Sequence, residues 1–565
     1  MLPGGALMFG YKGVMRVTVL IIVTLLIHHV TPARSHSGTP ALSARSCLVW
    51  GAGLDPHALL PVRYFYIQAV QGSGQNITHS PGKIHSFIHP PTHTPTHSPT
   101  HPPIHTSLTH SLIYLQNITH SPGADSFQVK ISALSPEERV RVHLPPPQDR
   151  NDGSFIVRFR LYSSALHGLK VEVFHKNTPV AQSPYILTGP VYHEDCDCPY
   201  SDSSDWLDVM KCPSEDPQIQ QDFSSFPSID LQRVRQEIPK RFFNRGVIHY
   251  SVINNRLYRR TLGKYTDFKM FSDEMLLSLM RKVRVPDVEF FINVGDWPLE
   301  TRKVSDVPGP VPIVSWCGSA DARDIVLPTY DVTHSTLETM RGVSIDVLSV
   351  QGNTGPAWQN KSERAFFRGR DSREERLNLA SMSRKHPDLL DAGITAYFFF
   401  REREKDLGKA PLVGFFDFFK YKYQVNVDGT VAAYRFPYLM LGDSLVLKQD
   451  SPYYEHFYTH LSPNRHYIPI KRSLSDLIQR IQWAKENDGE VEQIAKAGQA
   501  AVRELLQPHR LYCYYYMVLQ HYATRQLTDP EIHPDMEEVQ QPSDPAAACE
   551  CHRRTQPNRP RSDEL

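Results

Sequence analysis

The sequence predicts a chain of two structural parts, an N-terminal all-β sandwich followed by a larger α/β domain. In the first part, the apolar residues at 155, 157, 159 and 161 alternate with polar or outward-facing residues, which is the period of a half-buried strand. In the second part, short apolar runs such as 288–294 are separated by stretches with helical spacing, such as 473–481. This alternation indicates a parallel sheet with helices on both faces, and ligands then bind beyond the carboxyl ends of its strands. We place the sandwich at about 40–190 and the α/β domain at about 191–530.

The two ends of the chain indicate a compartment. Basic residues precede an apolar run at 17–27 that is short for a bilayer span, so residues 1–35 are predicted to be a secretory signal peptide. The segment 531–565, predicted to be a flexible tail, ends in Arg-Ser-Asp-Glu-Leu, which is close to the Lys-Asp-Glu-Leu retrieval address. Together they predict a protein of the endoplasmic reticulum lumen that binds the retrieval receptor and does not insert into the membrane.

Composition excludes some classes of function and leaves others open. A length of 565 residues allows two or three domains, and a net charge of +1 argues against a nucleic-acid binder. In an oxidising lumen some of the eight cysteines should be bridged. Cys196 and Cys198 are too close to pair easily with each other, so we expect distant partners such as Cys212 or Cys513. The cysteine count permits zinc, but no second Cys-x-x-Cys or His pair supports it.

Low-complexity sequence interrupts the predicted sandwich at about 75–115. An identical eight-residue segment occurs at 75–82 and 116–123, with a Pro/Thr/His-rich stretch between the copies. Histidines recur there every four residues, but the intervening prolines forbid the helix that would align them, so a disordered loop is favoured over a metal site. The identical copies point to a recent duplication or a gene-model error. Three sequons could carry N-glycans, at Asn76, Asn117 and Asn360.

One short stretch gathers arginines in a pattern suited to phosphate. Arg368, Arg370, Arg373 and Arg376 fall within nine residues, together with Gly369. Arginine presents a planar fork of donors that fits phosphate oxygens, and glycine lets the backbone approach a ligand closely. A helix beginning after Gly369 would add the positive field of its N-terminus. On this stretch alone, a diphosphate seat and a solvated basic turn are equally supported.

Two further stretches end strands at the expected ligand edge. Asp296 follows an apolar strand on a glycine-flanked turn, where it suits a ligand contact or an ordinary turn or cap. Small residues within 430–435 are expected at a helix start that lets a nucleotide lie close. Arg435 could then be a second phosphate clamp, or it could extend from an amphipathic helix to water. Glu455 could accept hydrogen bonds from ribose hydroxyls.

These motifs carry a resemblance to a known family. Segments 293–298, 316–319, 367–373 and 428–435 resemble the CAP10-like protein O-glucosyltransferases, and segments 51–54, 152–155 and 183–185 resemble a filamin-type immunoglobulin-like repeat. The subgroup with a filamin-type repeat and a Lys-Asp-Glu-Leu-like tail agrees in domain order over nearly the whole mature chain. The resemblance implies a GT-B glycosyltransferase of two Rossmann-like halves behind the sandwich. It also implies a UDP-glucose donor and, as acceptors, serine hydroxyls of EGF-like repeats in Notch-like and fibrillin-like proteins.

The resemblance assigns roles to individual residues. Asp296 matches the catalytic base, and Trp297 lies on the acceptor side where the best-studied branch has Tyr. Arg370 stands where that branch has Ser, so a hydroxyl contact cannot be carried over there. The resemblance also implies a disulfide between Cys196 and Cys513. The positions that match UDP-sugar contacts are Arg370, Arg376, Thr430, Val431, Ala432, Ala433, Tyr434 and Arg435.

The implied chemistry is a single inversion at the sugar. Asp296 would take the serine proton, and Arg376 and Arg435 would offset charge on the leaving diphosphate. We therefore expect activity without a metal or other cofactor. Two alternatives stay open. One is a resident, non-catalytic protein that binds clients through the β-sandwich. The other is an enzyme that uses UDP-xylose, because the two donors differ by one hydroxymethyl group.

Overall fold

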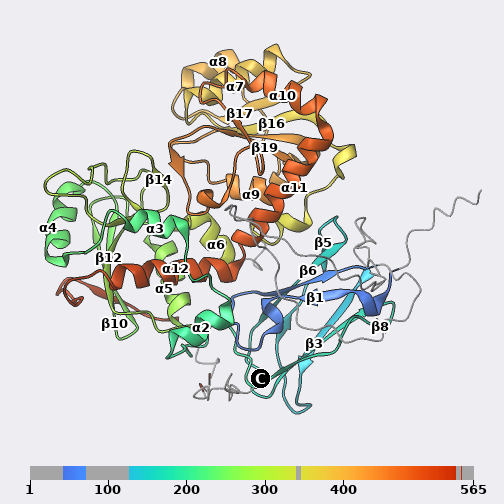
Figure 1. Ribbon diagram of the computed structural model, residues 1–565, viewed down its shortest axis with the longest axis vertical. Helices are drawn as coiled ribbons and strands as arrows, with labels where there is room; N and C mark the ends of the chain where they lie inside the picture. Colours follow the sequence, from blue (N-terminus) through green and yellow to red (C-terminus); the bar gives the residue numbers. More distant parts are fainter. Residues whose placement is uncertain (1–41, 71–125, 339–344, 543–548, 550, 552–565) are drawn as a thin grey trace, which may run out of the picture. The chain divides into compact units, whose positions relative to one another are not determined.

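The computed structural model describes residues 42–70, 126–338, 345–542, 549 and 551 (Figure 1). The predicted signal peptide, the low-complexity insertion, the sequons at Asn76 and Asn117, and the C-terminal retrieval sequence lie outside the described residues. Asn360 is described, and it is exposed at the end of the 3-10 turn Trp358–Asn360. Across the described ranges, no helix combines the length and the apolar character that a bilayer crossing requires.

The N-terminal part consists of two antiparallel sheets that share one core. Alternate side chains of β6 and β7, such as Phe155, Val157 and Val171, fill this core, which confirms the two-residue period read from the sequence. On β2, Tyr64 and Tyr66 point the other way and join the core of the α/β part. The first sheet comprises β1 (Leu48–Trp50), β2 (Arg63–Gln68), β6 (Ser154–Leu161), β4 (Val142–His143) and β5 (Gln148–Asp149); the second comprises β3 (Gln128–Ala133), β7 (Gly168–His175), β8 (Thr178–Pro179) and β9 (Tyr185–Thr188).

The first half of the α/β part has a mixed sheet, where the sequence predicts a parallel one. Only β12, β13 and β15 run parallel, while β10, β11 and β22 pair antiparallel. Asn254 and Asn255 form a two-residue hairpin with φ of 54° and 59°, a left-handed conformation that Asn tolerates. The sheet order is β15 (Ile325–Val326), β13 (Ile313–Ser315), β12 (Val288–Asn293), β10 (Val247–Ile253), β11 (Arg256–Leu262) and β22 (Glu537–Val539).

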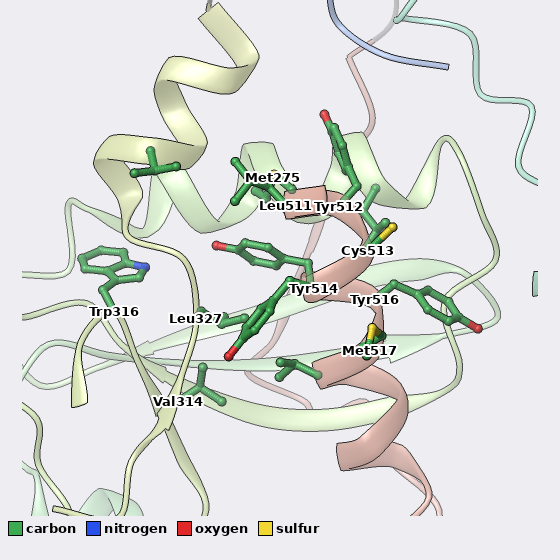
Figure 2. Close-up of a cluster of buried hydrophobic side chains, with 14 of the residues drawn as sticks. Met275, Val314, Trp316, Leu327, Leu511, Tyr512, Cys513, Tyr514, Tyr516 and Met517 are labelled. Atoms are coloured by element: carbon green, nitrogen blue, oxygen red, sulfur yellow. The ribbon is translucent and has the colours of Figure 1, made fainter. Parts of the chain in front are cut away.

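One helix from the C-terminal end of the chain completes the core of this half. In α12 (Pro508–Ala523), Tyr514 and Met517 belong to the same buried cluster as Val314 and Leu327 (Figure 2). The Tyr514 hydroxyl donates to the carbonyl of Val326 over 3.0 Å. The helix thus ties the C-terminal end to the strands that carry the first half of the cleft. The other helices of this half are α2 (Ser203–Met210), α3 (Pro217–Phe223), α4 (Leu231–Arg241), α5 (Lys269–Met280) and α6 (Tyr330–Glu338).

The second half has the predicted parallel sheet. Its strand order is β17 (Leu390–Ala396), β16 (Ser362–Arg370), β18 (Tyr421–Asn426), β19 (Leu445–Gln449) and β21 (Ile468–Ile470), all parallel. A small ladder joins β14 (Gly318–Ser319) of the first half to β20 (Tyr453–Tyr454). The helices are α7 (Glu374–Lys385), α8 (Glu404–Leu407), α9 (Phe436–Leu441), α10 (Leu477–Glu486) and α11 (Asp488–Leu505). Because the first sheet is mixed, the GT-B description with two Rossmann-like halves stays a prediction.

An ion-pair network holds the C-terminal segment against the first sheet. Glu289 is fully buried and accepts two bonds from Arg235, at 2.7 and 2.6 Å. It also contacts His249 at 2.7 Å and His533 at 3.3 Å. Burial lowers the pKa of His249 to about 4, so this imidazole is neutral at pH 7. The three groups lie close enough to ligate a metal, but Arg235 already occupies both carboxylate oxygens, so the cluster acts as a structural tether.

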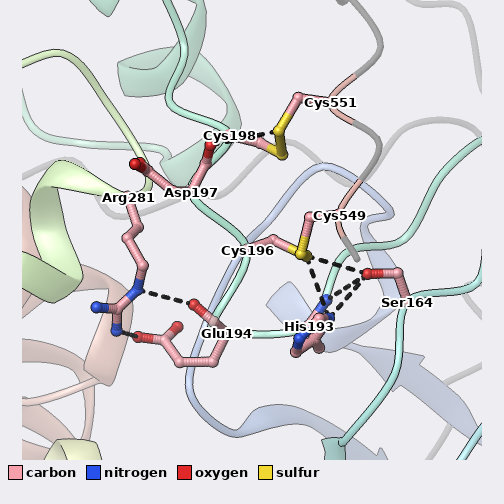
Figure 3. The surroundings of a disulfide bond; sticks show 9 residues. All are labelled: Ser164, His193, Glu194, Cys196, Asp197, Cys198, Arg281, Cys549 and Cys551. Atoms are coloured by element: carbon pink, nitrogen blue, oxygen red, sulfur yellow. Dashed lines mark hydrogen bonds and ion pairs between the residues drawn. A yellow bond between two sulfur atoms is a disulfide. The ribbon is translucent and has the colours of Figure 1, made fainter. Parts of the chain in front are cut away.

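The disulfide pairing differs from the implied one. The described residues contain the bridges Cys196–Cys549 and Cys198–Cys551, which Figure 3 shows, and the bridge Cys212–Cys513. The implied Cys196–Cys513 bridge is therefore wrong. The C-terminal Cys-x-Cys has the spacing of the linker Cys-x-Cys, and their Cα atoms lie 5.5 and 5.4 Å apart. Cys513 instead lies beside Cys212, just after α2, with a Cα separation of 5.4 Å.

Removing the Cys212–Cys513 bridge by a double replacement with Ser should destabilise the protein. This bridge joins cysteines that are 301 residues apart. A disulfide restricts the unfolded chain and thereby typically adds ~2–4 kcal/mol to the free energy of unfolding. Urea unfolding followed by fluorescence would measure the loss. An unchanged midpoint would contradict the pairing.

Candidate active site

A cleft with a cavity volume of about 560 Å³ is lined by both halves of the α/β part. Ligand sites typically have volumes of about 300–1,000 Å³. The first half contributes Asp296 and the start of α6, while the second contributes the ends of β16 and β18. Trp297 is not among the lining residues; it is partly exposed beside Asp296, with its ring 6.0 Å from that of Tyr453. The cleft brings together these predicted residues: Asp296, Arg370, Arg376, Thr430, Val431, Ala432, Ala433, Tyr434 and Arg435.

The side chain of Asn293 shapes the turn that presents Asp296. All six residues of β12 are buried, and the strand ends at Asn293. Its amide nitrogen donates to the carbonyl of Trp297 over 2.7 Å, and its amide oxygen accepts from the N–H of Gly295 over 3.0 Å. Two bonds from one buried amide therefore fix the loop on both sides of Asp296.

A second layer of polar groups holds the loop after Asp296. Asp324 is buried and accepts bonds from the N–H groups of Leu299 and Glu300, both over 2.8 Å. Burial raises the pKa of Asp324 to about 6, and its hydrogen bonds act in the opposite direction. Glu300 is itself clamped by both terminal nitrogens of Arg241, at 2.6 and 2.7 Å. The loop is thus anchored to buried ion pairs, which pre-organises the carboxylate.

The electrostatics of Asp296 suit a general base. Its side chain is exposed to the cleft, and partial desolvation there raises the pKa of the carboxyl above its ordinary value. The positive charge of Arg370 lowers this pKa in part. The raised pKa makes the carboxylate a stronger proton acceptor, while Arg370 keeps it ionised.

This pair predicts a pH dependence. A base works only when deprotonated, so kcat should fall as pH drops through the raised pKa of Asp296, above the ordinary value of about 4. Replacing Arg370 with Gln removes a charge that lowers that pKa, so the acid limb should move to higher pH. The kcat profile is measured at saturating donor, because weaker donor binding alone changes KM and leaves the limb in place. A limb that does not move would contradict the coupling.

Arg376 lies beneath the arginine-rich side of the cleft and holds two of its loops together. The residue is 4% exposed, in the first turn of α7, and it donates to the carbonyls of Asp428 at 2.7 Å and Val427 at 3.1 Å. It also reaches the carbonyl of Arg370 over 3.1 Å. Burial, followed by the nearby positive charge of Arg435, lowers its pKa to about 9. Its guanidinium therefore joins the loops after β16 and β18. It also places a positive charge in the wall of the cleft.

The two glycines of these loops leave room for guanidinium groups. A Cβ on Gly369 would lie 3.1 Å from Arg435 and 3.3 Å from Arg376, and one on Gly429 would lie 3.3 Å from Arg376. The sequence predicts that Gly369 lets the backbone approach a ligand closely. In the structure, the missing Cβ leaves room for the Phe367 ring, whose nearest atom would lie 2.9 Å away, and for these two arginines.

The remaining arginines divide into structural and available groups. Arg368 is paired with Asp391 at 2.7 Å, and Arg373 donates to the carbonyl of Thr430 over 3.0 Å. Arg435 donates to the carbonyl of Arg368, and burial lowers its pKa to about 10. Arg370 is exposed and has its guanidinium carbon 5.5 Å from the centre of the Phe398 ring. Arg370 is therefore the cationic group of this stretch most available to a ligand.

Two expectations about local structure need correction. Residues 430–435 are irregular, and α9 begins only at Phe436, so the small residues do not open a helix. Glu455 is fully buried and is not among the residues that line the cleft. Burial raises its pKa to about 8, so Glu455 is largely protonated at neutral pH, and a role with ribose is not supported.

Some residues that line the cleft were not predicted from the sequence. Tyr330 and Asp331 begin α6 and line the cleft on the side of Asp296. Burial and the charge of Asp296 raise the pKa of Tyr330 to about 12, which keeps its hydroxyl a donor. Leu412 and Phe415 add an apolar wall from the second half. None of these four residues lies directly after a predicted strand. A search for ligand contacts at the ends of strands therefore could not predict them.

The chain is similar in sequence to known glycosyltransferases. The sequence profile of glycosyl transferase family 90 matches residues 208–560. Protein O-glucosyltransferase 3 of Homo sapiens is 59% identical over 522 residues, which are 92% of this chain and 95% of that protein. Protein O-glucosyltransferase 2 of Danio rerio is 47% identical and covers 91% of this chain and 94% of its own. Protein O-glucosyltransferase 1 of Homo sapiens is 29% identical over 54% of this chain and 78% of its own.

Among solved structures, the crystal structure of the Lin-41 filamin domain covers 26% of this chain and 94% of its own, with 12% identity. Its TM-score of 0.13 is too low to support an argument, so the filamin-type assignment of the sandwich rests on sequence resemblance. The family profile covers well over half of the chain, and two of the relatives match nearly its full length. The chain therefore belongs to glycosyl transferase family 90, as a glycosyltransferase of the CAP10-like protein O-glucosyltransferase group.

Proposed function

We propose that the chain transfers glucose from UDP-glucose to serine hydroxyls of folded EGF-like repeats in the endoplasmic reticulum lumen. The observation that carries this proposal is a single cleft in which a pre-organised carboxylate, Asp296, faces an arginine-rich seat. The relatives, which are named protein O-glucosyltransferases, support the sugar and the protein acceptor. The predicted signal peptide and tail support the compartment.

The reaction balances as one displacement. The serine oxygen forms a bond to C1 of glucose while the bond from C1 to the β-phosphate oxygen breaks, and the serine proton passes to Asp296. The bonding electrons leave with UDP, whose new negative charge lies against Arg370, with Arg376 and Arg435 behind it. Attack from the side opposite the leaving group inverts C1, so an α-linked donor gives a β-linked product. Trp297, exposed beside the base, is placed to contact the acceptor.

Removal of divalent metal should leave turnover unchanged. The arginines can offset the diphosphate charge, and the Asp195-Cys196-Asp197 segment, whose spacing resembles a metal-binding Asp-x-Asp, has its cysteine in the bridge to Cys549. Transfer is measured after dialysis against EDTA and again after Mg²⁺ or Mn²⁺ is restored. Activity that is lost in EDTA and returns with either metal would contradict a metal-independent reaction.

A donor screen with folded EGF-like repeats tests the proposal. The purified chain is incubated with each repeat and with UDP-glucose, UDP-xylose or no donor, and the mass of the repeat is measured. Gain of one hexose on serine from UDP-glucose is the expected result. A pentose gain alone would replace the donor with UDP-xylose. No gain on several repeats would favour the non-catalytic client-binding alternative.

A further inference from the structure

A second cavity, of about 470 Å³, lies between the β-sandwich and α11. The sandwich contributes the rings of Trp50 and Tyr66, whose centres are 5.6 Å apart, and also Arg150. The helix contributes Lys496 and Arg503. The cavity is therefore separate from the Asp296 cleft, with which it shares no lining residue.

The acidic groups around this cavity already have partners. Asp152 accepts from Arg503 over 2.8 Å and from the hydroxyl of Ser154 over 2.5 Å. Asp443 lies 2.9 Å from the ammonium of Lys361, which is outside the cavity. Similarly, the carboxylate of Glu504 is bonded to the side chains of Arg510 and Gln507, at 2.9 and 2.7 Å. Each of these carboxylates therefore already has a cationic partner: Arg503, Lys361 or Arg510.

The two arginines are less well satisfied. The Arg503 side chain is 91% buried and has one ion pair, to Asp152, while its Nε and Nη2 have no partner among the described residues. Arg150 packs over the Tyr66 ring at 5.0 Å, and its buried Nε also lacks an acceptor within the described part of the chain. Burial, followed by the charge of Arg150, lowers the pKa of Arg503 to about 10. An additional anion would relieve both the repulsion between these two cationic groups and their unmet hydrogen bonds.

We propose that this cavity binds a small oxyanion, a phosphate or carboxylate group, between Arg150 and Arg503. Arginine forks suit both kinds of oxygen. Lys496 also lines the cavity, but its ammonium is paired with Glu492 at 2.7 Å, so the two arginines carry the proposal. Trp50 is 45% exposed, so its ring offers a face to a planar or apolar part of the same ligand. The site joins the sandwich to α11, and its occupation should therefore strengthen the contact between the two parts of the chain.

Isothermal titration of the full chain with inorganic phosphate, and separately with citrate, tests this site at constant ionic strength. The variants are Arg150→Gln in the cavity, Arg370→Gln in the Asp296 cleft, and Arg465→Gln as a matched exposed control. Arg150 makes no side-chain hydrogen bond to a described residue, so its replacement should leave the fold and the transferase activity intact. We expect saturable binding of at least one probe, weakened about tenfold or more by Arg150→Gln and unchanged by the other two variants.

The two probes identify the ligand chemistry. Tighter phosphate binding would assign a phosphate ligand, and tighter citrate binding a carboxylate ligand; either result supports the site. Binding that survives Arg150→Gln but is lost in Arg370→Gln would place the anion in the transferase cleft and overturn the proposal. Absence of saturable binding by both probes would also overturn it and leave the cavity as a water-filled interface.

Discussion

Replacing Asp296 with Asn is expected to lower the transfer rate about a hundred- to ten-thousandfold, the usual contribution of a general base. The amide has nearly the same shape as the carboxylate but cannot accept the serine proton. Donor binding should survive, because the arginine seat lies on the other half of the cleft. Single-turnover kinetics would measure the chemical step, and titration with UDP would measure donor affinity.

A second Asp-to-Asn replacement, outside the cleft, serves as the matched control for the loss of one negative charge. Asp321 is exposed in the same half and is not among the cleft residues. Asp321→Asn should therefore retain wild-type transfer and UDP affinity. Wild-type rates in Asp296→Asn would remove Asp296 from the role of base, whereas loss of UDP binding in that variant would show that the two halves are not independent.

Replacing Arg376 with Ala should have the second large effect, on both stability and donor binding. The guanidinium donates to the carbonyls of Asp428, Val427 and Arg370, so its removal leaves buried acceptors unpaired. Each unpaired group costs ~1–3 kcal/mol, and we expect a total loss of about 3 kcal/mol in unfolding free energy. The loops after β16 and β18 would lose their common anchor, and UDP affinity should fall about a hundredfold, or ~2.7 kcal/mol.

Arg384→Ala is the control on the same helix. Arg384 is exposed in the last turn of α7, is not among the residues that line the cleft, and donates to the carbonyl of Asp406. Its replacement should leave UDP affinity unchanged. A folded Arg376→Ala protein with wild-type UDP affinity would contradict the account of the seat. Arg376→Lys should recover only part of the affinity, because an ammonium cannot reproduce the planar fork.

Part of the candidate site could be predicted because its residues follow strands. Asp296 comes after β12 and the segment beginning at 427 comes after β18, whereas Arg370, which ends β16, is predicted by the clustering of arginines and by the family resemblance. In a sheet with helices on its faces, these ends are where ligands bind, and the structure brings all three into one cleft. The alternation at 155–161 likewise predicts which side chains of β6 point into the core of the sandwich.

What sequence reasoning missed depends on contacts between distant segments. The hairpin at Asn254 and Asn255 joins β10 to β11 in antiparallel pairing, which makes the first sheet mixed. The Asn-Asn turn is a local signal for this hairpin, but the apolar runs on which the parallel sheet was predicted do not include it. The Cys196–Cys549 bridge spans 353 residues, and no local pattern specifies which of several cysteines it joins. Arg376 is predicted to contact phosphate, and the structure shows a further role, because its guanidinium donates to two backbone carbonyls of the loop after β18. That second role depends on carbonyl directions, which spacing does not reveal.

The configuration of the transferred sugar tests the central claim most directly, namely that Asp296 deprotonates the serine while the arginine seat holds the leaving diphosphate. A folded EGF-like repeat is modified by the chain with UDP-glucose, and the anomeric proton of the product is examined by NMR before and after digestion with a β-glucosidase. We predict a β-linked glucose from the α-linked donor. An α-linked product would contradict the single displacement and with it the role of Asp296.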